Sequence, residues 1–222
     1  MTQLTISKLK PAELRALVNY QEEDGTACTW VNPPDIQLDA LEQQQVETLQ
    51  TRLRRERTHL MNEATIWSRA IYPLLLLAER DPIQAWAEIE LSAQYKAFSI
   101  AGIADGVLGR CIAGEMETPY LIVVEAKRGS EAENPKYPLC GQILAAAHLN
   151  WQKEGTDPGE LFGCYTIADV WTFVRAQVAG FEAERPTLKL EFSQEYLEKI
   201  EAAEILRILK GIVRQLSDSA MA

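Results

Sequence analysis

The sequence predicts an α/β fold in which a mixed central sheet is flanked by helices, with a long helical extension at the N-terminus. Two patterns alternate along the chain: apolar residues every three or four positions, typical of helices, and at every second position, typical of half-buried strands. An alanine-rich helical stretch, residues 139–153, lies between two predicted strands and can serve as a crossover between parallel partners. The 222 residues, 47% of them hydrophobic, suffice for one well-buried domain.

Residues 1–60 are expected to form an extension packed on a main domain at residues 61–222. The extension begins with a short amphipathic helix around residues 11–20, and a turn follows at residues 22–25. A long helix is then predicted over residues 35–59, and its narrow apolar stripe suits contact with a neighbour along one edge. This helix is a candidate arm for homodimerisation. Its stripe consists of Leu38, Leu41, Val46, Leu49, Leu53 and Leu60.

The same helix carries the most concentrated positive charge in the chain, at Arg52, Arg54, Arg55 and Arg57. Such a run forms either a solvated helical face or a surface that follows phosphates. The net charge of −10 argues against coating of the whole protein with nucleic acid. A local basic cleft remains compatible with that charge, because phosphate contacts need only a few positioned cations.

The main domain is expected to begin with a helix capped by Asn62. A period-two stretch over residues 86–95 predicts a strand that forms a hairpin with a second strand, residues 98–111. The dipeptide Asp105-Gly106 interrupts the second strand, where a glycine allows a bulge or a close backbone approach. The rest of the chain is predicted as a strand at 120–127, a loop at 129–138, the crossover helix, strands at 161–167, 169–180 and 187–192, and a helix from Ser193 to residue 216.

The strand at residues 120–127 is apolar until its end, where two charged residues appear. Glu125 and Lys127 lie two positions apart, so they share one face of the strand with Leu121 and Val123. Charges in such a place are costly unless they are paired or have a function. A surface ion pair is one interpretation of these two residues, and a functional site is the other.

Functional chemistry follows if the neighbouring acidic residues converge on this strand end. Asp105 lies in the preceding strand, and Glu63 heads the helix that is expected to pack beside it. Mg²⁺ prefers oxygen ligands, which Asp105, Glu125 and the carbonyl of Ala126 would provide, and Mn²⁺ is a possible substitute. Such a metal polarises a phosphodiester and generates a hydroxide nucleophile, while Lys127 would orient the water or stabilise the developing charge.

Asp105-Gly106, followed after 20 positions by Glu125-Ala126-Lys127 at the end of an apolar strand, resembles the PD-(D/E)XK, or restriction-endonuclease-like, nuclease superfamily. The resemblance covers roughly residues 62–178. It implies a core of one helix, a three-strand antiparallel meander, a crossover helix and a further strand, which agrees with the order of elements predicted here.

The resemblance also implies a role for each residue that matches its pattern. Asp105 and Glu125 would be metal ligands and Lys127 the catalytic lysine, whereas Glu63 would be the acidic residue of the first core helix. Gln142 would be the polar residue that some members carry on the helix after the Glu-X-Lys strand.

Two positions depart from the pattern of the superfamily. Ala104 precedes Asp105 where many members have proline. Position 146 is Ala146, so the glutamine and tyrosine motif of the RecB-like branch is incomplete. Membership of that branch, with its exonuclease or helicase-linked roles, is therefore not expected.

The leading functional hypothesis is a Mg²⁺-dependent nuclease that acts on DNA. The alternative is a catalytically inactive nuclease-fold scaffold that binds nucleic acid or a protein partner, and the acidic net charge favours it. Action on RNA or a nucleotide is a lesser alternative, because no RNA-reading module is recognisable. We expect a cytoplasmic protein without a membrane partner, since the sequence lacks a signal peptide and a long apolar segment and its four cysteines are widely spaced.

Overall fold

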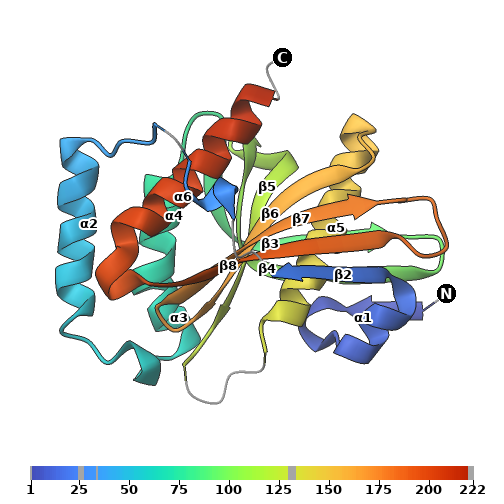
Figure 1. The fold of residues 1–222 in the computed structure, drawn as a ribbon, viewed down its shortest axis with the longest axis horizontal. Helices are drawn as coiled ribbons and strands as arrows, with labels where there is room; N and C mark the ends of the chain where they lie inside the picture. Colours follow the sequence, from blue (N-terminus) through green and yellow to red (C-terminus); the bar gives the residue numbers. More distant parts are fainter. Residues whose placement is uncertain (1, 25–27, 34, 130–133, 220–222) are drawn as a thin grey trace.

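The structure is a computed structural model that describes residues 2–24, 28–33, 35–129 and 134–219. These residues form one mixed, eight-stranded sheet with helices on both faces, which confirms the α/β class (Figure 1). The strand order is β1-β4-β5-β6-β7-β8-β2, and β3 pairs with β4 outside this path. The strands are β1 (Thr2–Thr5), β2 (Asn19–Asp24), β3 (Ile83–Gln94), β4 (Phe98–Ile112), β5 (Glu115–Lys127), β6 (Gly159–Ile167), β7 (Val170–Ala179) and β8 (Thr187–Leu197).

The helical segments lie between and around these strands. The α-helices are α1 (Pro11–Leu17), α2 (Ala40–Leu53), α3 (Glu63–Ile66), α4 (Tyr72–Leu77), α5 (Lys136–Glu154) and α6 (Glu198–Ser219). Three short 3₁₀ segments are η1 (Ile6–Lys8), η2 (Thr29–Val31) and η3 (Thr58–Leu60), and η4 (Trp67–Ile71) is a π-helical turn between α3 and α4. Within the described part of the chain, none of these helices is long and apolar enough to cross a membrane.

The N-terminal region corrects the prediction of a helical extension, because it begins with a strand and supplies two strands to the sheet. β1 pairs in parallel with the start of β4, and β2 pairs in parallel with β8. β2 replaces the expected turn at residues 22–24, and residue 25 of that turn lies outside the described residues. Its sequence, Asn-Tyr-Gln-Glu-Glu-Asp, has no apolar alternation, because a strand at the edge of a sheet tolerates polar and charged residues that an inner strand would not.

The central elements follow the predicted order. β3, β4 and β5 form an antiparallel meander, α5 crosses over, and β6 then pairs in parallel with β5. β3 pairs along most of β4, so β1 and β5 share the other edge of that strand. This arrangement places the carboxyl ends of β5 and β6 side by side.

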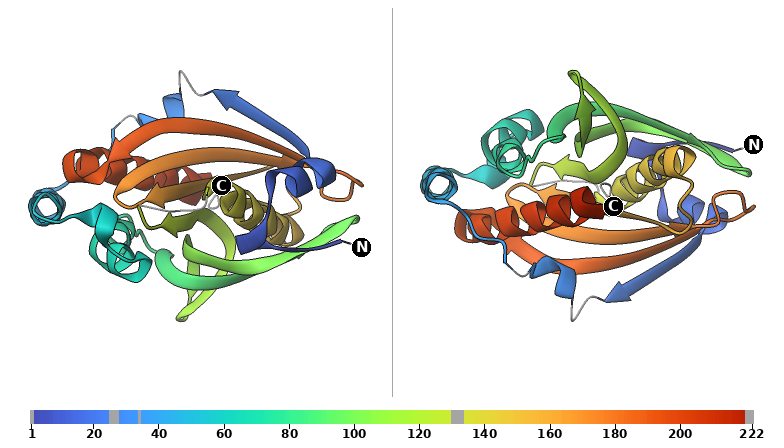
Figure 2. Two further views of the ribbon diagram at one scale, coloured as in Figure 1. Left: turned by 90° about the horizontal axis from the view of Figure 1, so that it is seen from below. Right: turned by 90° about the horizontal axis from the view of Figure 1, so that it is seen from above.

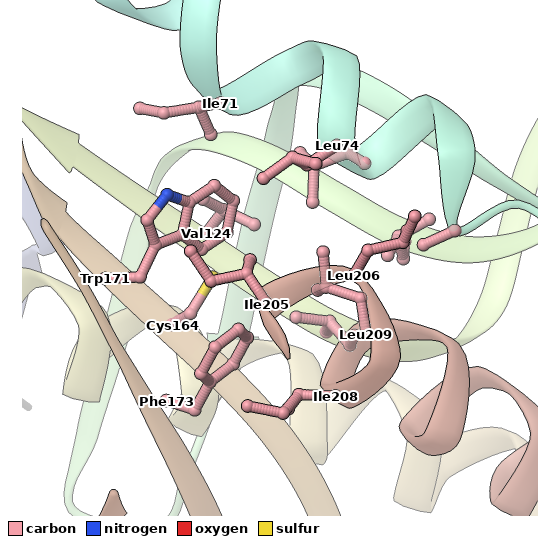
Figure 3. Close-up of a cluster of buried hydrophobic side chains, with 14 of the residues drawn as sticks. Ile71, Leu74, Val124, Cys164, Trp171, Phe173, Ile205, Leu206, Ile208 and Leu209 are labelled. Carbon is pink, nitrogen blue, oxygen red and sulfur yellow. The ribbon is translucent and has the colours of Figure 1, made fainter. Parts of the chain in front are cut away.

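Two apolar clusters hold the helices against the sheet. On one face, α5 packs through residues such as Leu139 and Ile143, together with α1. On the other face, α6 packs through Ile205 and Leu209 against Trp171 and the core residues drawn in Figure 3. Each fully buried aliphatic side chain of this kind contributes roughly 1.5–3 kcal/mol to folding. Figure 2 shows that the two helices lie on opposite sides of the twisted sheet.

Two predicted boundaries are wrong for identifiable reasons. α5 begins at Lys136, inside the expected loop, because Pro138 lies in the first helical turn, where its missing N–H has no intrahelical partner anyway. Ser193 does not cap α6, which begins at Glu198. Its hydroxyl oxygen instead accepts a hydrogen bond from the Phe173 N–H at 2.9 Å, at a register shift between β7 and β8.

The long helix predicted over residues 35–59 is shorter than expected. α2 begins after Asp39, whose carboxylate accepts a hydrogen bond from the Glu42 N–H, and it ends at Leu53. Its buried residues Val46, Leu49 and Leu53 belong to the same core cluster as α6. This part of the predicted apolar stripe is thus covered within the chain, whereas Leu41 and Leu60 of the same stripe are exposed, and homodimerisation stays a prediction.

Candidate active site

The candidate site lies where β4 and β5 run side by side at the carboxyl end of β5. Gly106 pairs with Val124, so the antiparallel register sets Asp105 opposite Glu125. On the other side of β4, Gly106 pairs with Ala87 of β3 and Ala104 pairs with Ile89. Between these two pairs, Asp105 and Glu88 are not paired with each other. Asp105 is therefore located at a local break in the ladder, although β4 continues through it.

Gly106 permits a close approach from the helical layer. A Cβ at this position would lie 2.3 Å from Cη2 of Trp67, a distance that side-chain atoms do not tolerate. The apolar side chains of β4 also change face here, because Ala104 packs in the α5 cluster and Leu108 in the α6 cluster. The close backbone approach expected at Asp105-Gly106 is present, and it brings the segment after α3 against the sheet.

Glu125 is held tightly from two sides. Its side chain is almost fully buried, with Nζ of Lys127 at 2.8 Å from Oε1. Nε2 of Gln142, on α5, donates a hydrogen bond to Oε2. The pKa of Glu125 is raised to about 7, mainly by burial and also by the nearby Asp105 carboxylate, while Lys127 opposes both effects. Protonated and ionised forms of Glu125 are therefore both accessible near neutral pH.

Asp105 is tied to the same strand as Glu125. Its Oδ2 accepts a hydrogen bond from the backbone N–H of Ala126 at 2.7 Å. Burial raises the pKa of Asp105, and the Ala126 hydrogen bond and the charge of Lys127 offset part of that rise. Burial lowers the pKa of Lys127. The carboxylates of Glu125, Glu63 and Asp105 raise it by more, so the net shift is upward. The lysine is therefore a cation at neutral pH.

Glu63 completes the group from the helical side. The Asn62 side chain caps α3 by accepting a hydrogen bond from the Thr65 N–H at 2.8 Å, which fixes the first turn. Oε1 of Glu63 lies 3.8 Å from Nζ of Lys127. The helix dipole favours a carboxylate at this position as well. Three carboxyl groups thus surround one ammonium group.

The acidic groups border an open cavity of about 460 Å³. Its walls come from β3, β4, β5, α3 and η4, so it is shaped by segments that are distant in sequence. Glu88, one of its residues, adopts φ 55°, a left-handed conformation that is strained for a residue with a side chain. The lining residues are Glu63, Ala64, Trp67, Ala87, Glu88, Asp105 and Ala126.

The donor set suits a hard divalent cation. Mg²⁺ binds proteins through one or two carboxylates and completes its shell with water and substrate oxygens. Asp105 and Glu125 are oxygen donors on adjacent strands, and Ala126 lines the cavity together with Asp105. The carboxyl groups outnumber the one lysine of the cluster, so the site carries an excess of negative charge. Over the described ranges, no group of three or more Asp, Glu, His or Cys side chains is arranged around a common metal position. A two-carboxylate site does not require one.

The structure brings together all the residues that the sequence singled out: Glu63, Asp105, Glu125, Lys127 and Gln142, with Ala126 between two of them. Four cavity residues were not predicted: the small Ala64 and Ala87, and the larger Trp67 and Glu88. Glu88 has the sequence pattern of a solvated strand face, and Trp67 has that of a core residue, so neither gave a distinguishing signal.

A second polar cluster at the same end of the sheet was also not predicted. Oγ1 of Thr58 donates a hydrogen bond to Oδ1 of Asp169 at 2.6 Å, and Nζ of Lys199 donates to that Oγ1 at 2.7 Å. Nζ of Lys199 also lies 3.4 Å from Oδ2 of Asp169. Next to them, the buried Glu198 accepts a hydrogen bond from Nε1 of Trp171 at 2.8 Å. Through these contacts, η3 and α6 are attached to the residue that precedes β7.

Comparison with known proteins adds nothing to this picture: no protein-family model and no curated protein matches the chain. The functional argument therefore depends on the geometry and chemistry of the site.

Proposed function

We propose that the protein is a divalent-metal-dependent nuclease of the restriction-endonuclease-like kind, which hydrolyses phosphodiester bonds of DNA. One observation carries the proposal: Glu125 is held between Lys127 and Gln142, opposite Asp105, and Asp105 and Ala126 line an open acidic cavity. The meander, crossover helix and parallel strand around it agree with the resemblance to the PD-(D/E)XK superfamily.

Asp105 and Glu125 would hold Mg²⁺ or Mn²⁺, with the carbonyl of Ala126 as a third donor. When bound, the cation would polarise the scissile phosphate and lower the pKa of water. Gln142 fixes the orientation of Glu125 by donating to Oε2, and it leaves Oε1 for the lysine and the cation. Ala126 does the same for Asp105 through its N–H.

Lys127 acts directly on the reacting groups in this scheme. Its ammonium is a donor beside the metal ligands, where it would orient the attacking water and stabilise the negative charge that develops on the phosphoryl oxygens. Glu63 helps to keep that ammonium protonated, because its carboxylate lies 3.8 Å from Nζ and raises the pKa of Lys127. The cavity lined by Glu63, Asp105 and Ala126 would admit a phosphate beside these residues.

Cleavage assays with Asp105→Asn and Glu125→Gln test the proposal. Plasmid and labelled oligonucleotide substrates are incubated with Mg²⁺ or Mn²⁺, and both variants are expected to lose cleavage while they retain the wild-type circular dichroism spectrum. Glu195→Gln is the matched control, because Glu195 is an exposed acid on β8. Wild-type rates in both site variants would contradict the proposal.

A non-catalytic scaffold is the second candidate, and one feature of the site favours it. Both oxygens of Glu125 have protein partners, and Asp105 accepts a backbone N–H, so the cluster is hydrogen-bonded without a metal. Titration calorimetry with Mn²⁺ separates the two functions. A nuclease is expected to bind Mn²⁺ in a manner that Asp105→Asn abolishes, whereas a scaffold should show no such heat.

A further inference from the structure

The end of α2 and the segment that follows it carry four arginines that the proposed chemistry does not use. Two of them stabilise the fold: Arg52 donates to the carbonyl of Arg69, and Nε of Arg54 donates to the carbonyl of Lys199 at 2.9 Å. Arg55 and Arg57 are exposed, and neither forms an ion pair with the residues that the structure describes. Two guanidinium groups are thus available to an external anion.

Neighbouring acidic residues do not neutralise these two arginines. Glu56 lies between them in sequence, but its carboxylate forms an ion pair with Arg69. Asp169, the acidic group closest to this segment in the second cluster, is buried and paired with Lys199. The pair Arg55 and Arg57 is therefore a local positive surface on a chain whose net charge is −10.

This surface is fastened next to the candidate active site. Thr58 follows Arg57 directly and is hydrogen-bonded to Asp169. The residue before Asp169, Ala168, donates its N–H to the carbonyl of Lys127 at 2.8 Å. A Cβ on Gly129 would lie 2.9 Å from Cα of His59, so η3 packs on the exit of β5. In Figure 1 the end of α2, η3 and the end of β5 accordingly lie at the lower end of the molecule.

We propose that Arg55 and Arg57 bind the phosphate backbone of the nucleic acid that enters the candidate active site. The inference rests on the proposed function for the identity of the ligand. The acidic cavity repels a polyanion until a metal neutralises it, so attraction must come from outside the cavity. Planar guanidinium groups pair with phosphate oxygens in a bidentate manner, and they follow a backbone without reading its sequence.

Binding is measured without catalysis, in EDTA, by fluorescence anisotropy of a fluorescein-labelled DNA duplex and of the corresponding single strand. The double variant Arg55→Gln/Arg57→Gln is compared with Lys8→Gln/Lys10→Gln, which removes two exposed lysines next to α1; in Figure 1, α1 lies on the right side of the molecule and α2 on the left. All four side chains are exposed, so both variants are expected to fold.

The arginine variant is expected to bind the duplex about tenfold more weakly for each arginine removed, as for other charge-assisted hydrogen bonds. The slope of log K against log salt should fall by about 0.9 for each lost contact on the duplex and about 0.7 on the single strand. The lysine variant should match the wild type. Equal affinity and equal slope in the arginine variant and the wild type overturn the inference, as does wild-type binding too weak to detect at low salt.

Cleavage assays separate the failure of this inference from the failure of the proposed function. If the arginines matter for binding but Mg²⁺ and Mn²⁺ never support cleavage, the nuclease proposal fails and the phosphate-binding surface stands. If cleavage occurs and the arginine variant retains the wild-type KM and affinity, the surface is excluded and the nuclease proposal stands.

Discussion

Two carboxylate–lysine pairs lie at the same end of the sheet, and they are equally buried. Glu125 pairs with Lys127 at 2.8 Å, and Asp169 lies 3.4 Å from Lys199. In each pair the acidic side chain is 5% exposed and the lysine side chain 22% exposed. Burial and pairing alone therefore do not separate a candidate active site from a structural ion pair.

The surroundings of the two pairs differ in charge and in access. Around Lys127, Glu63 and Asp105 add further carboxyl groups, and the cluster opens on a cavity. Around Lys199, Thr58 shares the ammonium with Asp169, and burial raises the pKa of the neighbouring Glu198 to about 8, so that this carboxyl is mostly neutral at pH 7. The cluster around Lys127 has an excess of negative charge beside open space, so it can accept a cation. The cluster around Lys199 has balanced charges and is closed, which is typical of a structural contact.

Replacement of Lys127 by methionine is the strongest test of this distinction. We expect Lys127→Met to reduce single-turnover cleavage by about 10²- to 10³-fold, the usual loss for one donor that stabilises a transition state. Stability should change by less than about 2 kcal/mol, because Glu125 can take up a proton near neutral pH instead of remaining as an unpaired charge. Urea unfolding at pH 7 measures the second quantity.

The outcome that contradicts this expectation is the reverse one: cleavage at the wild-type rate with a large loss of stability. It would assign Lys127 to the structure and remove it from the catalytic scheme. Mg²⁺ must be present in the cleavage assay and absent during unfolding, so that metal binding does not mask the effect on stability.

The same substitution in the second pair should have the opposite consequence. Lys199→Met removes the partner of buried Asp169 and one hydrogen bond to Thr58, which should cost about 3–5 kcal/mol. Cleavage at a temperature where the variant is folded should stay near the wild-type rate. Asp169→Asn/Lys199→Met serves as the control, since removal of both charges is expected to recover part of the stability.

The candidate site could be predicted from sequence because its residues stand out from the local sequence pattern. Glu125 and Lys127 end an apolar strand, Asp105-Gly106 is a marked break in the preceding strand, and the spacing between them suits an antiparallel pair. The order of meander, crossover helix and parallel strand followed from periodicity for the same reason.

The features that sequence did not predict depend on contacts between distant segments. β1 and β2 are edge strands without apolar alternation, and only their pairing with β4 and β8 defines them. Ser193 looks like a helix cap, but a hydrogen bond to the Phe173 N–H across two strands decides its role. The cluster of Thr58 and Lys199 joins residues 141 positions apart, which no local pattern reveals.

Gly106 offers a test of how the cavity beside the first pair is shaped. Gly106→Ala would place a methyl group 2.3 Å from Cη2 of Trp67, so we expect a loss of about 1–3 kcal/mol, as for other overpacked sites. Urea unfolding of Gly106→Ala, Trp67→Phe and the double variant forms a double-mutant cycle. The smaller phenylalanine ring should relieve the clash, and strictly additive effects would exclude a direct contact.

The smallest expected effect comes from Glu198 in the second cluster, whose ionisation should make the free energy of unfolding depend on pH. Burial is the main cause of its raised pKa, and nearby Asp169 adds to it, while the Trp171 hydrogen bond and the charges of Arg52 and Lys199 oppose it. The folded protein therefore keeps a proton that the unfolded chain has already lost above about pH 4.5. Stability should fall as pH rises towards 8, by at most about 1.4 kcal/mol per pH unit for this one proton.

Glu198 makes the larger contribution between pH 7 and 8, because Glu125, with a pKa of about 7, is already half ionised at pH 7 and mostly ionised at pH 8. Urea unfolding at several pH values in this range should show a falling free energy of unfolding for the wild type and a flatter dependence for Glu198→Gln. Glu125→Gln should reduce the slope between pH 5 and 7 without abolishing it, because Glu198 contributes there as well, and it should change the slope less between pH 7 and 8. If Glu198→Gln leaves the slope above pH 7 unchanged, the second cluster holds Glu198 ionised, and its charge balance is not the one inferred from its contacts.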